Sequence, residues 1–267
     1  MNNTILIISI LFCSIPLISQ NNNLYVEYEV IYNTSSPRIK KSILKTEGNI
    51  KAEYIEFPEY KLLKSSEQKE PSETTKTVNY NTKGTIRRIK TNLVEKKISS
   101  IETIIFDKII YNVIEGLPKT KWNTNYTETK LIGKFNCFKA TSSFRGRNYI
   151  IWYAEKIPIG FGPWKLFGAP GLILEAYDDT FTYKWIVKKI TQENKEFEQK
   201  IKNLNYDKEI NLKDFVDKKY VNPISAKSLE NKITSKLPRG VNLKVKKNPN
   251  RQGKELIFEW EKETTQN

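Results

Sequence analysis

The stretch GPWKLFGAPGLILEAYDD, residues 162–179, places turn-forming residues directly before a run of strand-forming ones. Its first ten positions carry three glycines and two prolines, namely Gly162, Pro163, Gly168, Pro170 and Gly171. Glycine permits positive φ angles or the close approach of two backbones, and proline keeps its neighbours extended. Trp164 and Phe167 add two large apolar side chains at the same corner. The stretch therefore predicts a rigid, aromatic-filled connection that leads into a β-strand.

Strand patterns continue on both sides of this connection. Residues 24–32 alternate apolar and polar side chains, which is typical of a strand with one buried face. Further stretches with strand character are 49–57, 75–81, 84–93, 103–114, 131–144, 148–159 and 171–190. Asp178, Asp179 and Thr180 interrupt the last of these, which indicates a tight hairpin turn. Successive strands with short turns favour antiparallel pairing, and the polar residues 64–76 predict a surface loop.

Helical signals are confined to the C-terminal part of the chain. Asn211 is a candidate N-cap, with Asp214 three residues later, and residues 225–240 repeat apolar side chains along one helix face. Residues 254–263 have the pattern of a final strand. We expect one domain over residues 20–267. It is mainly β, a curved antiparallel sheet or open half-barrel with one or two C-terminal helices.

The N-terminus has the pattern of an export signal. MNNTILIISILFCSIPLISQ, residues 1–20, has no charged side chain and an apolar run from Ile5 to Phe12. That run is too short to span a bilayer. The pattern predicts a signal peptide over residues 1–19, with an N-terminal membrane anchor as the alternative. We therefore expect an exported protein with no transmembrane segment in its mature chain.

The residue inventory excludes several classes of chemistry. The chain has no histidine, and Cys137 is the only cysteine after the predicted signal peptide. Ser-His-Asp and Cys-His catalysis, His-ligated zinc and Cys-rich metal sites are therefore excluded. Neither a phosphate-binding loop nor a dinucleotide-binding motif occurs. We expect no enzyme activity and no cofactor, and we expect Cys137 to pack as a small buried hydrophobe.

The formal net charge of +15 raises the question of a polyanionic partner. Lysines outnumber arginines by 38 to 7, whereas phosphate and base recognition favours the guanidinium group. The lysines are also scattered along the chain and interleaved with acids. We expect a solvated basic surface and no nucleic-acid partner, with attraction to anionic lipid head groups as an open alternative.

Five residues near the connection are candidate ligand-binding residues: Arg145, Arg147, Trp152, Trp164 and Phe167. Two guanidinium groups two residues apart on a strand share one face and are suited to clasp a phosphate or a carboxylate. The alternative is a structural role, in which the arginines form ion pairs or stack on rings. Clustered aromatic residues likewise line apolar pockets or form core. Both interpretations stay open from the sequence.

Glu175, Asp178 and Asp179 are the best candidates for a metal site. Carboxylate oxygens suit calcium. The alternative is a hairpin turn with solvated acids, which the turn residues favour. We therefore expect no metal here.

Residues 131–179 resemble the GLPGLI family of Gram-negative envelope proteins. The shared features are an Ile-Gly step, a cysteine followed by Lys-Ala, an aromatic-x-Gly-Arg step, an aromatic-rich strand, Ile-Pro, Gly-Pro and the naming hexapeptide. In this chain they fall on Ile132, Gly133, Cys137, Lys139, Ala140, Phe144, Gly146, Arg147, Trp152, Ile157, Pro158, Gly162, Pro163, Gly168, Ala169, Pro170, Gly171, Leu172 and Ile173. Ala169 departs from the family pattern, which usually has leucine there.

The resemblance implies an envelope protein, periplasmic or associated with the outer membrane, and it implies no catalytic residue. We expect a non-enzymatic protein that binds an apolar or amphipathic ligand, such as a lipid, near Trp152, Trp164 and residues 168–173. The alternative is an accessory or scaffold protein that docks onto an outer-membrane transport complex. An exposed aromatic patch would indicate this second function.

Overall fold

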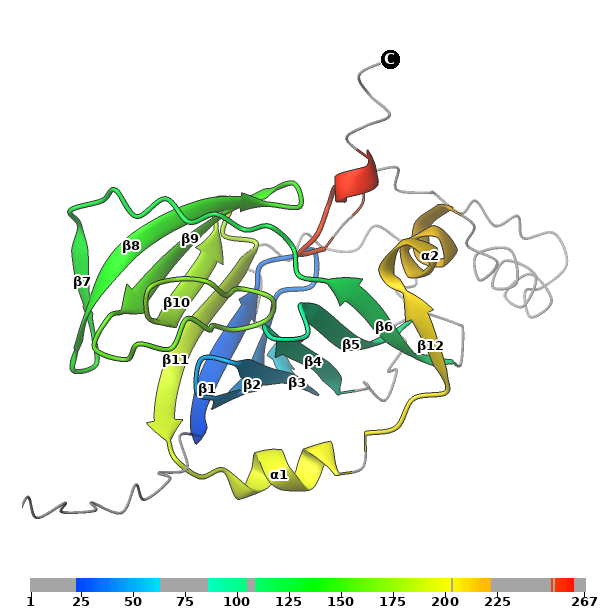
Figure 1. Ribbon diagram of the computed structural model, residues 1–267, viewed down its shortest axis with the longest axis horizontal. Coiled ribbons are helices and arrows are strands. Elements are labelled where there is room, and N and C mark those ends of the chain that lie inside the picture. The colour runs from blue at the N-terminus through cyan, green and yellow to red at the C-terminus, as the bar shows by residue number, and fades with distance from the viewer. Residues whose placement is uncertain are drawn as a thin grey trace, which may run out of the picture.

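The protein is described by a computed structural model, which covers residues 23–62, 86–104, 109–202, 204–221, 251 and 253–261. Within these residues the strands form a single twelve-stranded sheet in the order β12-β6-β5-β4-β3-β2-β1-β11-β10-β9-β8-β7. The sheet is strongly curved and stays open, with β12 and β7 at its two edges (Figure 1). The expected fold class, a mainly β protein with a curved open sheet and short helices near the C-terminus, is confirmed.

Every neighbouring pair of strands is antiparallel except β12 and β6, which run parallel. The strands are β1 Asn23–Tyr32, β2 Arg38–Glu47, β3 Lys51–Leu62, β4 Arg87–Asn92, β5 Lys97–Thr103, β6 Ile110–Gly116, β7 Thr129–Ile132, β8 Phe135–Phe144, β9 Arg147–Ala154, β10 Leu172–Asp178, β11 Tyr183–Thr191 and β12 Lys208–Asn211. β1 pairs with β11, which brings the N-terminal strand into the middle of the sheet. The hairpin expected at residues 178–180 joins β10 to β11.

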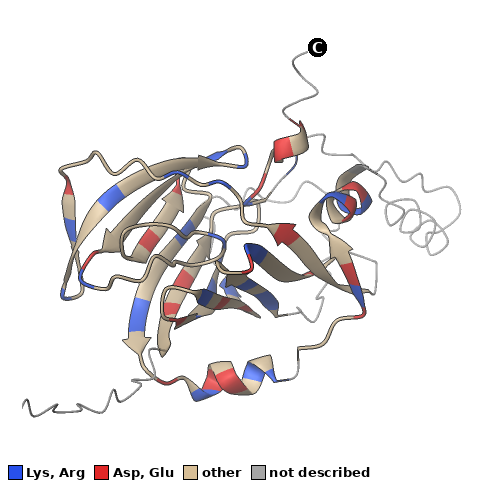
Figure 2. Cartoon of the chain, in the orientation of Figure 1, with Lys and Arg blue, Asp and Glu red and all other residues tan. Residues whose placement is uncertain are grey.

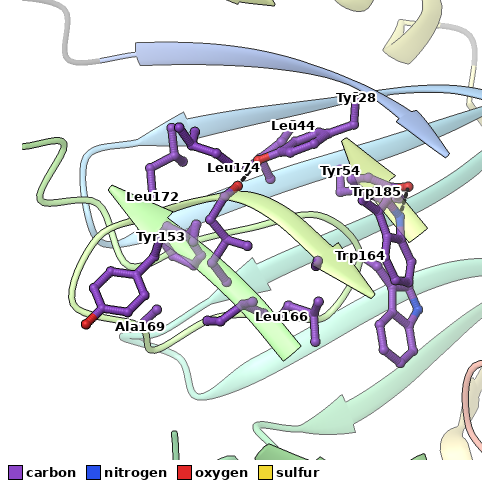
Figure 3. Packing of buried hydrophobic residues seen from close by; sticks show 14 of the residues in the cluster. Tyr28, Leu44, Tyr54, Tyr153, Trp164, Leu166, Ala169, Leu172, Leu174 and Trp185 are labelled. Atoms are coloured by element: carbon purple, nitrogen blue, oxygen red, sulfur yellow. Dashed lines mark hydrogen bonds between the residues drawn. The ribbon is translucent and has the colours of Figure 1, made fainter. Parts of the chain in front are cut away.

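The main core lies on the inner face of the curve. Alternate residues of β1, among them Val26, Tyr28 and Val30, are almost fully buried there. The connection between β9 and β10, residues 155–171, packs against the same face through Trp164 and other buried side chains (Figure 3). The long connection therefore fills the inside of the curve.

A smaller core lies on the other face of β1 to β3. Helix α1, Lys195–Ile201, begins at Asn194, whose side chain accepts a hydrogen bond from the backbone N–H of Phe197. The Phe197 ring is fully buried against Tyr25, Ile43 and neighbouring side chains. Helix α1 thus covers a patch that the alternation of the strands leaves apolar.

A third cluster joins β6 to the C-terminal part of the chain. Helix α2, Leu212–Val216, has Asn211 as its N-cap, and the Asn211 side chain accepts a hydrogen bond from the backbone N–H of Asp214. This cap was expected from the sequence and is confirmed. A π-helical turn, Asp217–Val221, follows α2 directly. Phe215 of α2 packs against Tyr111 of β6 at a ring-centroid distance of 5.8 Å.

Two expectations are wrong, and several elements were not expected. Residues 254–261, the described part of the strand expected at 254–263, do not form a strand. A short 3₁₀ turn, Glu259–Glu261, lies there, and the carboxylates of this segment bind Arg145. Residues 131–144 form a hairpin, β7 and β8, and not one strand. Strands β2 and β5 and helix α1 were not foreseen, because their apolar residues are interspersed with many charged and polar ones.

Several expectations fall outside the described residues and are not tested by them. These are the signal peptide at 1–19, the loop at 64–76, the strand at 75–81 and the helix at 225–240. Among the described residues no helix is long and apolar enough to cross a membrane.

Candidate binding site

The β9–β10 connection depends on glycine at defined points. A Cβ atom on Gly171 would lie 2.2 Å from the backbone oxygen of Ala154, so only glycine lets these two backbones approach. Gly168 has a φ of +84°, a conformation that other residues rarely adopt. Both features were expected from the sequence and are confirmed. They explain how a connection of this length turns back into β10.

The aromatic residues of the connection are mostly core. Trp164 is 5% exposed, and its ring stacks on Trp185 at 6.1 Å with an interplanar angle of 11° (Figure 3). Phe167 is half-buried, and its carbonyl accepts a hydrogen bond of 2.8 Å from the indole N–H of Trp122. Between Phe167, Trp164 and strands β2 to β4 there is no space large enough for a water molecule. The corner at residues 161–167 therefore has no room for a ligand on its sheet-facing side.

Trp152 does not lie beside Trp164. In β9 the side chains of Tyr149, Ile151 and Tyr153 are buried in the inner core, so the alternation of the strand directs Trp152 to the opposite face. The ammonium group of Lys130 lies 5.6 Å from the centre of its ring. The structure thus separates two of the residues that the sequence grouped as one ligand site.

Arg145 is committed to contacts within the chain. It lies in the β8–β9 turn with a φ of +44° and is 7% exposed. Its guanidinium group forms ion pairs with Glu115 at 2.7 Å, with Glu259 at 3.0 Å and with Glu255. Arg145 therefore has the structural role that was the alternative to ligand binding. Its guanidinium group is ion-paired and lies over the rings of Phe144 and Phe258.

Arg147 has a similar role two residues later. Its guanidinium group donates to the Asp178 carboxylate at 2.7 Å and to the carbonyl of Gly253 at 2.7 Å. It also lies 5.0 Å from the ring of Tyr183. Arg145 and Arg147 are thus brought together, and what they hold is the C-terminal segment, defined as residues 253–261.

The three candidate metal ligands have separate partners. Glu175 is 5% exposed and lies between Lys130 at 2.5 Å and Lys184 at 3.1 Å. Asp178 is fully buried, binds Arg147 and accepts a hydrogen bond of 2.6 Å from the backbone N–H of Tyr183. Asp179 is exposed and accepts a hydrogen bond from the Asn148 side chain. Among the described residues no group of three acidic or sulfur side chains is placed to hold a metal ion.

Cys137 is buried and free. Burial raises the pKa of its thiol to about 11, so the thiol stays protonated and is a poor nucleophile at neutral pH. The expectation that Cys137 packs as a small hydrophobe is confirmed by its place in the main core.

A hollow of about 490 Å³ lies on the far side of Trp164, between strands β1, β2, β4 to β6 and β11, helix α2 and the C-terminal segment. This volume is within the range of small-molecule sites. One wall is apolar and consists of Val113, Leu212, Phe215, Val216 and Phe258. The remaining lining holds five cationic side chains, Arg38, Arg87, Lys165, Lys219 and Lys254, and two acidic ones, Glu102 and Glu255. The hollow is therefore lined by both apolar and cationic side chains.

Two of these cations have no carboxylate partner among the described residues. Arg38 donates to the carbonyl of Ser36 at 3.2 Å and lies 4.8 Å from the ring of Tyr32. Lys219 lies over the rings of Phe215 and Tyr220, at 5.5 Å and 5.3 Å. Arg87, by contrast, is ion-paired with Glu102 at 3.1 Å. Arg38 and Lys219 are thus the cations of the hollow that remain available to an acidic group.

A buried ionic cluster borders the hollow. The ammonium group of Lys254 donates to the Glu56 carboxylate at 3.0 Å and to the Tyr32 hydroxyl at 2.9 Å. The Tyr32 hydroxyl in turn donates to the other oxygen of Glu56 at 2.6 Å. These three residues close a hydrogen-bonded ring that joins the C-terminal segment to β1 and β3.

The environment shifts both charged groups of this cluster. Burial lowers the pKa of Lys254 to about 8, and the Glu56 charge opposes that shift. Burial alone would raise the pKa of Glu56, but the positive charges of Lys254, Arg87 and Lys40 hold it well below its ordinary value. Glu56 therefore stays ionised at every physiological pH, while Lys254 titrates not far above neutrality.

A second depression, of about 350 Å³, lies over β2 to β6. Lysine and glutamate side chains of both signs line it, and none of its lining residues is aromatic. Figure 2 shows the same interleaving of basic and acidic positions over most of the sheet. This depression therefore has the character of ordinary solvated surface.

Sequence reasoning did not find the residues around the hollow other than Trp164. Tyr32, Glu56 and Lys254 lie in three different segments of the chain, and Glu56 and Lys254 are 198 positions apart. The only local signals were an acid between Ile55 and Phe57 in β3 and a lysine in an expected terminal strand. Neither signal shows, without the fold, which residue the acid or the lysine would contact.

No family model matches the chain, and no curated protein matches it. Two solved structures of PNGF-II, in P21 and C2 space groups, are similar to it, each with 14% sequence identity and with TM-scores of 0.49 and 0.47. The matches cover 74% and 73% of this chain but 33% and 32% of those structures, so the chain spans about a third of their length. A likeness at this level carries no argument about function.

Proposed function

We propose that this chain is an exported, non-enzymatic envelope protein that binds an amphipathic ligand with an acidic group in the hollow beside Trp164. The observation that carries the proposal is that the hollow combines an apolar wall with two cations, Arg38 and Lys219, that lack carboxylate partners among the described residues. An acidic head group would pair with these cations, and its chain would cover the wall of β6 and α2.

Location and family belong to the same proposal. The apolar, uncharged stretch at residues 5–12 supports export. The resemblance of residues 131–179 to the GLPGLI family supports an envelope location, periplasmic or at the outer membrane. The aromatic corner expected to hold the ligand is packed on its sheet-facing side, so the proposal places the ligand on the other side of Trp164.

Calorimetric titration of the mature chain with dodecanoate tests this function. We expect binding in the micromolar range. Arg38→Ala and Lys219→Ala should each weaken it about tenfold, because a charge-assisted contact contributes about 1.4 kcal/mol or more. Lys188→Ala is the matched control, since Lys188 is exposed on β11, pairs with Glu29 and does not line the hollow. Equal affinity of all three variants and the wild type would contradict this site.

Native mass spectrometry of the protein purified from its own cell envelope identifies the ligand class. A defined mass excess of lipid or metabolite size supports the binding function. A bare chain that copurifies with a membrane protein would favour the scaffold function instead. The described surface offers that alternative no specific support, because its exposed aromatic residues, Tyr60, Phe181 and Tyr206, lie on separate elements.

A further inference from the structure

Four aromatic rings surround the ammonium group of Lys254. The centroids of Tyr32 and Trp185 lie 5.0 Å from its nitrogen. Tyr183 and Trp164 lie at 5.8 Å and 6.0 Å. Rings at these distances attract a cation through their negative faces, and such cages are a common means of recognising ammonium groups.

The cage also distinguishes between kinds of ammonium group. Besides the four rings, the cage contains two hydrogen-bond acceptors. The Tyr32 hydroxyl and the Glu56 carboxylate both accept hydrogen bonds from the Lys254 nitrogen. A quaternary ammonium group has no N–H to donate, so Oε2 of Glu56 and the Tyr32 hydroxyl would both lose the hydrogen bond that Lys254 gives them, which is costly in a buried site. The geometry therefore suits a primary ammonium group.

The occupant of the cage comes from a segment that is held like a bound peptide. The carbonyls of Gly253 and Lys254 accept hydrogen bonds from Arg147 at 2.7 Å and from Tyr149 at 2.9 Å. The backbone N–H groups of Leu256 and Ile257 both donate to the carbonyl of Arg145, at 2.8 Å and 3.2 Å. Main-chain hydrogen bonds together with one deeply placed side chain are the usual elements of peptide recognition.

Ion pairs of Glu255 also hold this segment. Glu255 lies between Arg145 and Lys165, with the Lys165 nitrogen 2.9 Å from its carboxylate. Burial would raise the pKa of Glu255, but these two cations lower it to about 2. The aromatic cage therefore binds the Lys254 ammonium group, and Arg145 and Lys165 beside it bind the Glu255 carboxylate.

We propose that Tyr32, Glu56, Trp164, Tyr183 and Trp185 form a binding site for a primary ammonium group, and that Lys254 occupies it as a tethered ligand. The site opens onto the hollow, because Tyr32, Trp164, Tyr183 and Lys254 all line that space. An external amine, from a small molecule or from a lysine in a peptide, competes with Lys254 for the cage. Tethering gives Lys254 the advantage of a high effective concentration.

Chemical rescue of the full mature chain with Lys254→Ala tests this site. This variant lacks the last three carbons and the nitrogen of the lysine, so n-propylammonium is the matching probe. We expect propylammonium to stabilise the variant against urea and to raise its folded-to-unfolded ratio about tenfold at ten times the dissociation constant. Propanol, sodium chloride and tetramethylammonium at equal concentration should give less than a twofold change.

Two further variants separate the cage from general effects of the amine. Lys188→Ala loses an exposed lysine that pairs with Glu29 at 3.3 Å, and it should show no rescue. Lys254→Ala combined with Glu56→Gln should lose the rescue, because the carboxylate that accepts the N–H is gone. If Lys254→Ala does not fold in buffer, the yield of folded protein as a function of propylammonium concentration provides the same measurement.

The source of the amine is distinguished with the blocked peptide acetyl-Gly-Lys-Glu-amide. Stronger stabilisation by this peptide than by propylammonium indicates a site for lysine within a peptide, and the reverse indicates a site for free amines. The proposal is overturned if neither probe exceeds sodium chloride in its effect on Lys254→Ala. No amphipathic ligand is present in these experiments, so their outcome is independent of the dodecanoate titration.

Discussion

The β9–β10 connection and the C-terminal segment both pack against the inner face of the curved sheet, and they are held there by different forces. The connection buries an almost continuous run from Gly160 to Leu166 and is shaped by glycine contacts. The C-terminal segment buries only Lys254 and Phe258 and is held by ion pairs and hydrogen bonds. Apolar burial involves no titrating group and no charge for salt to screen, whereas paired charges respond to pH and are screened by salt. The β9–β10 connection is therefore part of the core, whereas the C-terminal segment is held in the way a bound ligand is held.

The largest effect is expected at Gly171 in the connection. Gly171→Ala places a Cβ atom 2.2 Å from the backbone oxygen of Ala154, and a backbone atom has little freedom to move away. We expect a loss of about 5 kcal/mol or more in the free energy of unfolding, measured by urea denaturation. Gly116→Ala is the control, because nothing lies within 4 Å of a Cβ at that position. Similar stabilities of the two variants would refute the close-packed corner.

The next effect comes from apolar burial in the same connection. Leu166 is 2% exposed, so Leu166→Ala should lower the free energy of unfolding by about 4 kcal/mol. Val94→Ala, at a position that is 73% exposed, should change it by less than about 0.5 kcal/mol. The loss in Leu166→Ala should be the same at pH 6 and pH 9, because no titrating group is removed. A clear pH dependence of this loss would contradict the idea that the connection, unlike the C-terminal segment, is held by apolar burial alone.

A smaller effect at neutral pH, but one with a pH signature, is expected for Lys254. Lys254→Met leaves Glu56 buried without its closest cation and should cost about 3 kcal/mol at pH 7. The folded pKa of Lys254 is about 8, against an ordinary value of 10.5, because burial disfavours its charged form. Between these two pH values the unfolded chain binds more protons at this group, so the free energy of unfolding of the wild type rises with pH.

The measurement is therefore the difference between wild type and Lys254→Met as a function of pH. That difference should widen by up to about 3 kcal/mol as the pH rises from 8 towards 10.5. Effects of other lysines cancel, since both chains contain them. A difference that stays constant or narrows over this range would show that burial does not lower the pKa of Lys254.

The smallest effect is expected at the rim of the C-terminal segment. The Glu259 side chain is 56% exposed and pairs with Arg145 at 3.0 Å. Glu259→Gln should cost less than about 1 kcal/mol, and the cost should fall further in 0.5 M sodium chloride. A loss as large as that of Lys254→Met would mean that the rim and the cage contribute equally to holding the segment.

Local sequence patterns were sufficient for several elements of this fold. The alternation in residues 24–32, the turn residues at 178–180 and the cap at Asn211 act over a few positions, and each forms the structure that its pattern predicts. The prediction of a terminal strand at 254–263 was wrong because it also relied on a local pattern alone. An alternating pattern indicates a strand only where a neighbouring strand is available to pair with it, and in this segment the acids bind Arg145 and Lys165.

The sequence by itself determined that this is a β-rich chain without histidine-based chemistry, with a glycine-shaped connection at residues 162–171 and a buried cysteine, Cys137. It also named Arg145, Arg147 and Trp164, but not their partners. Only the tertiary structure decided that the two arginines hold the chain's own C-terminal segment, that Trp152 and Trp164 lie on opposite faces, and that Lys254 meets Glu56. The physical reason is range. Turns, caps and alternation are set by neighbours in the chain, whereas ion pairs and cages are set by the curvature of the sheet, which brings together residues 100 to 200 positions apart.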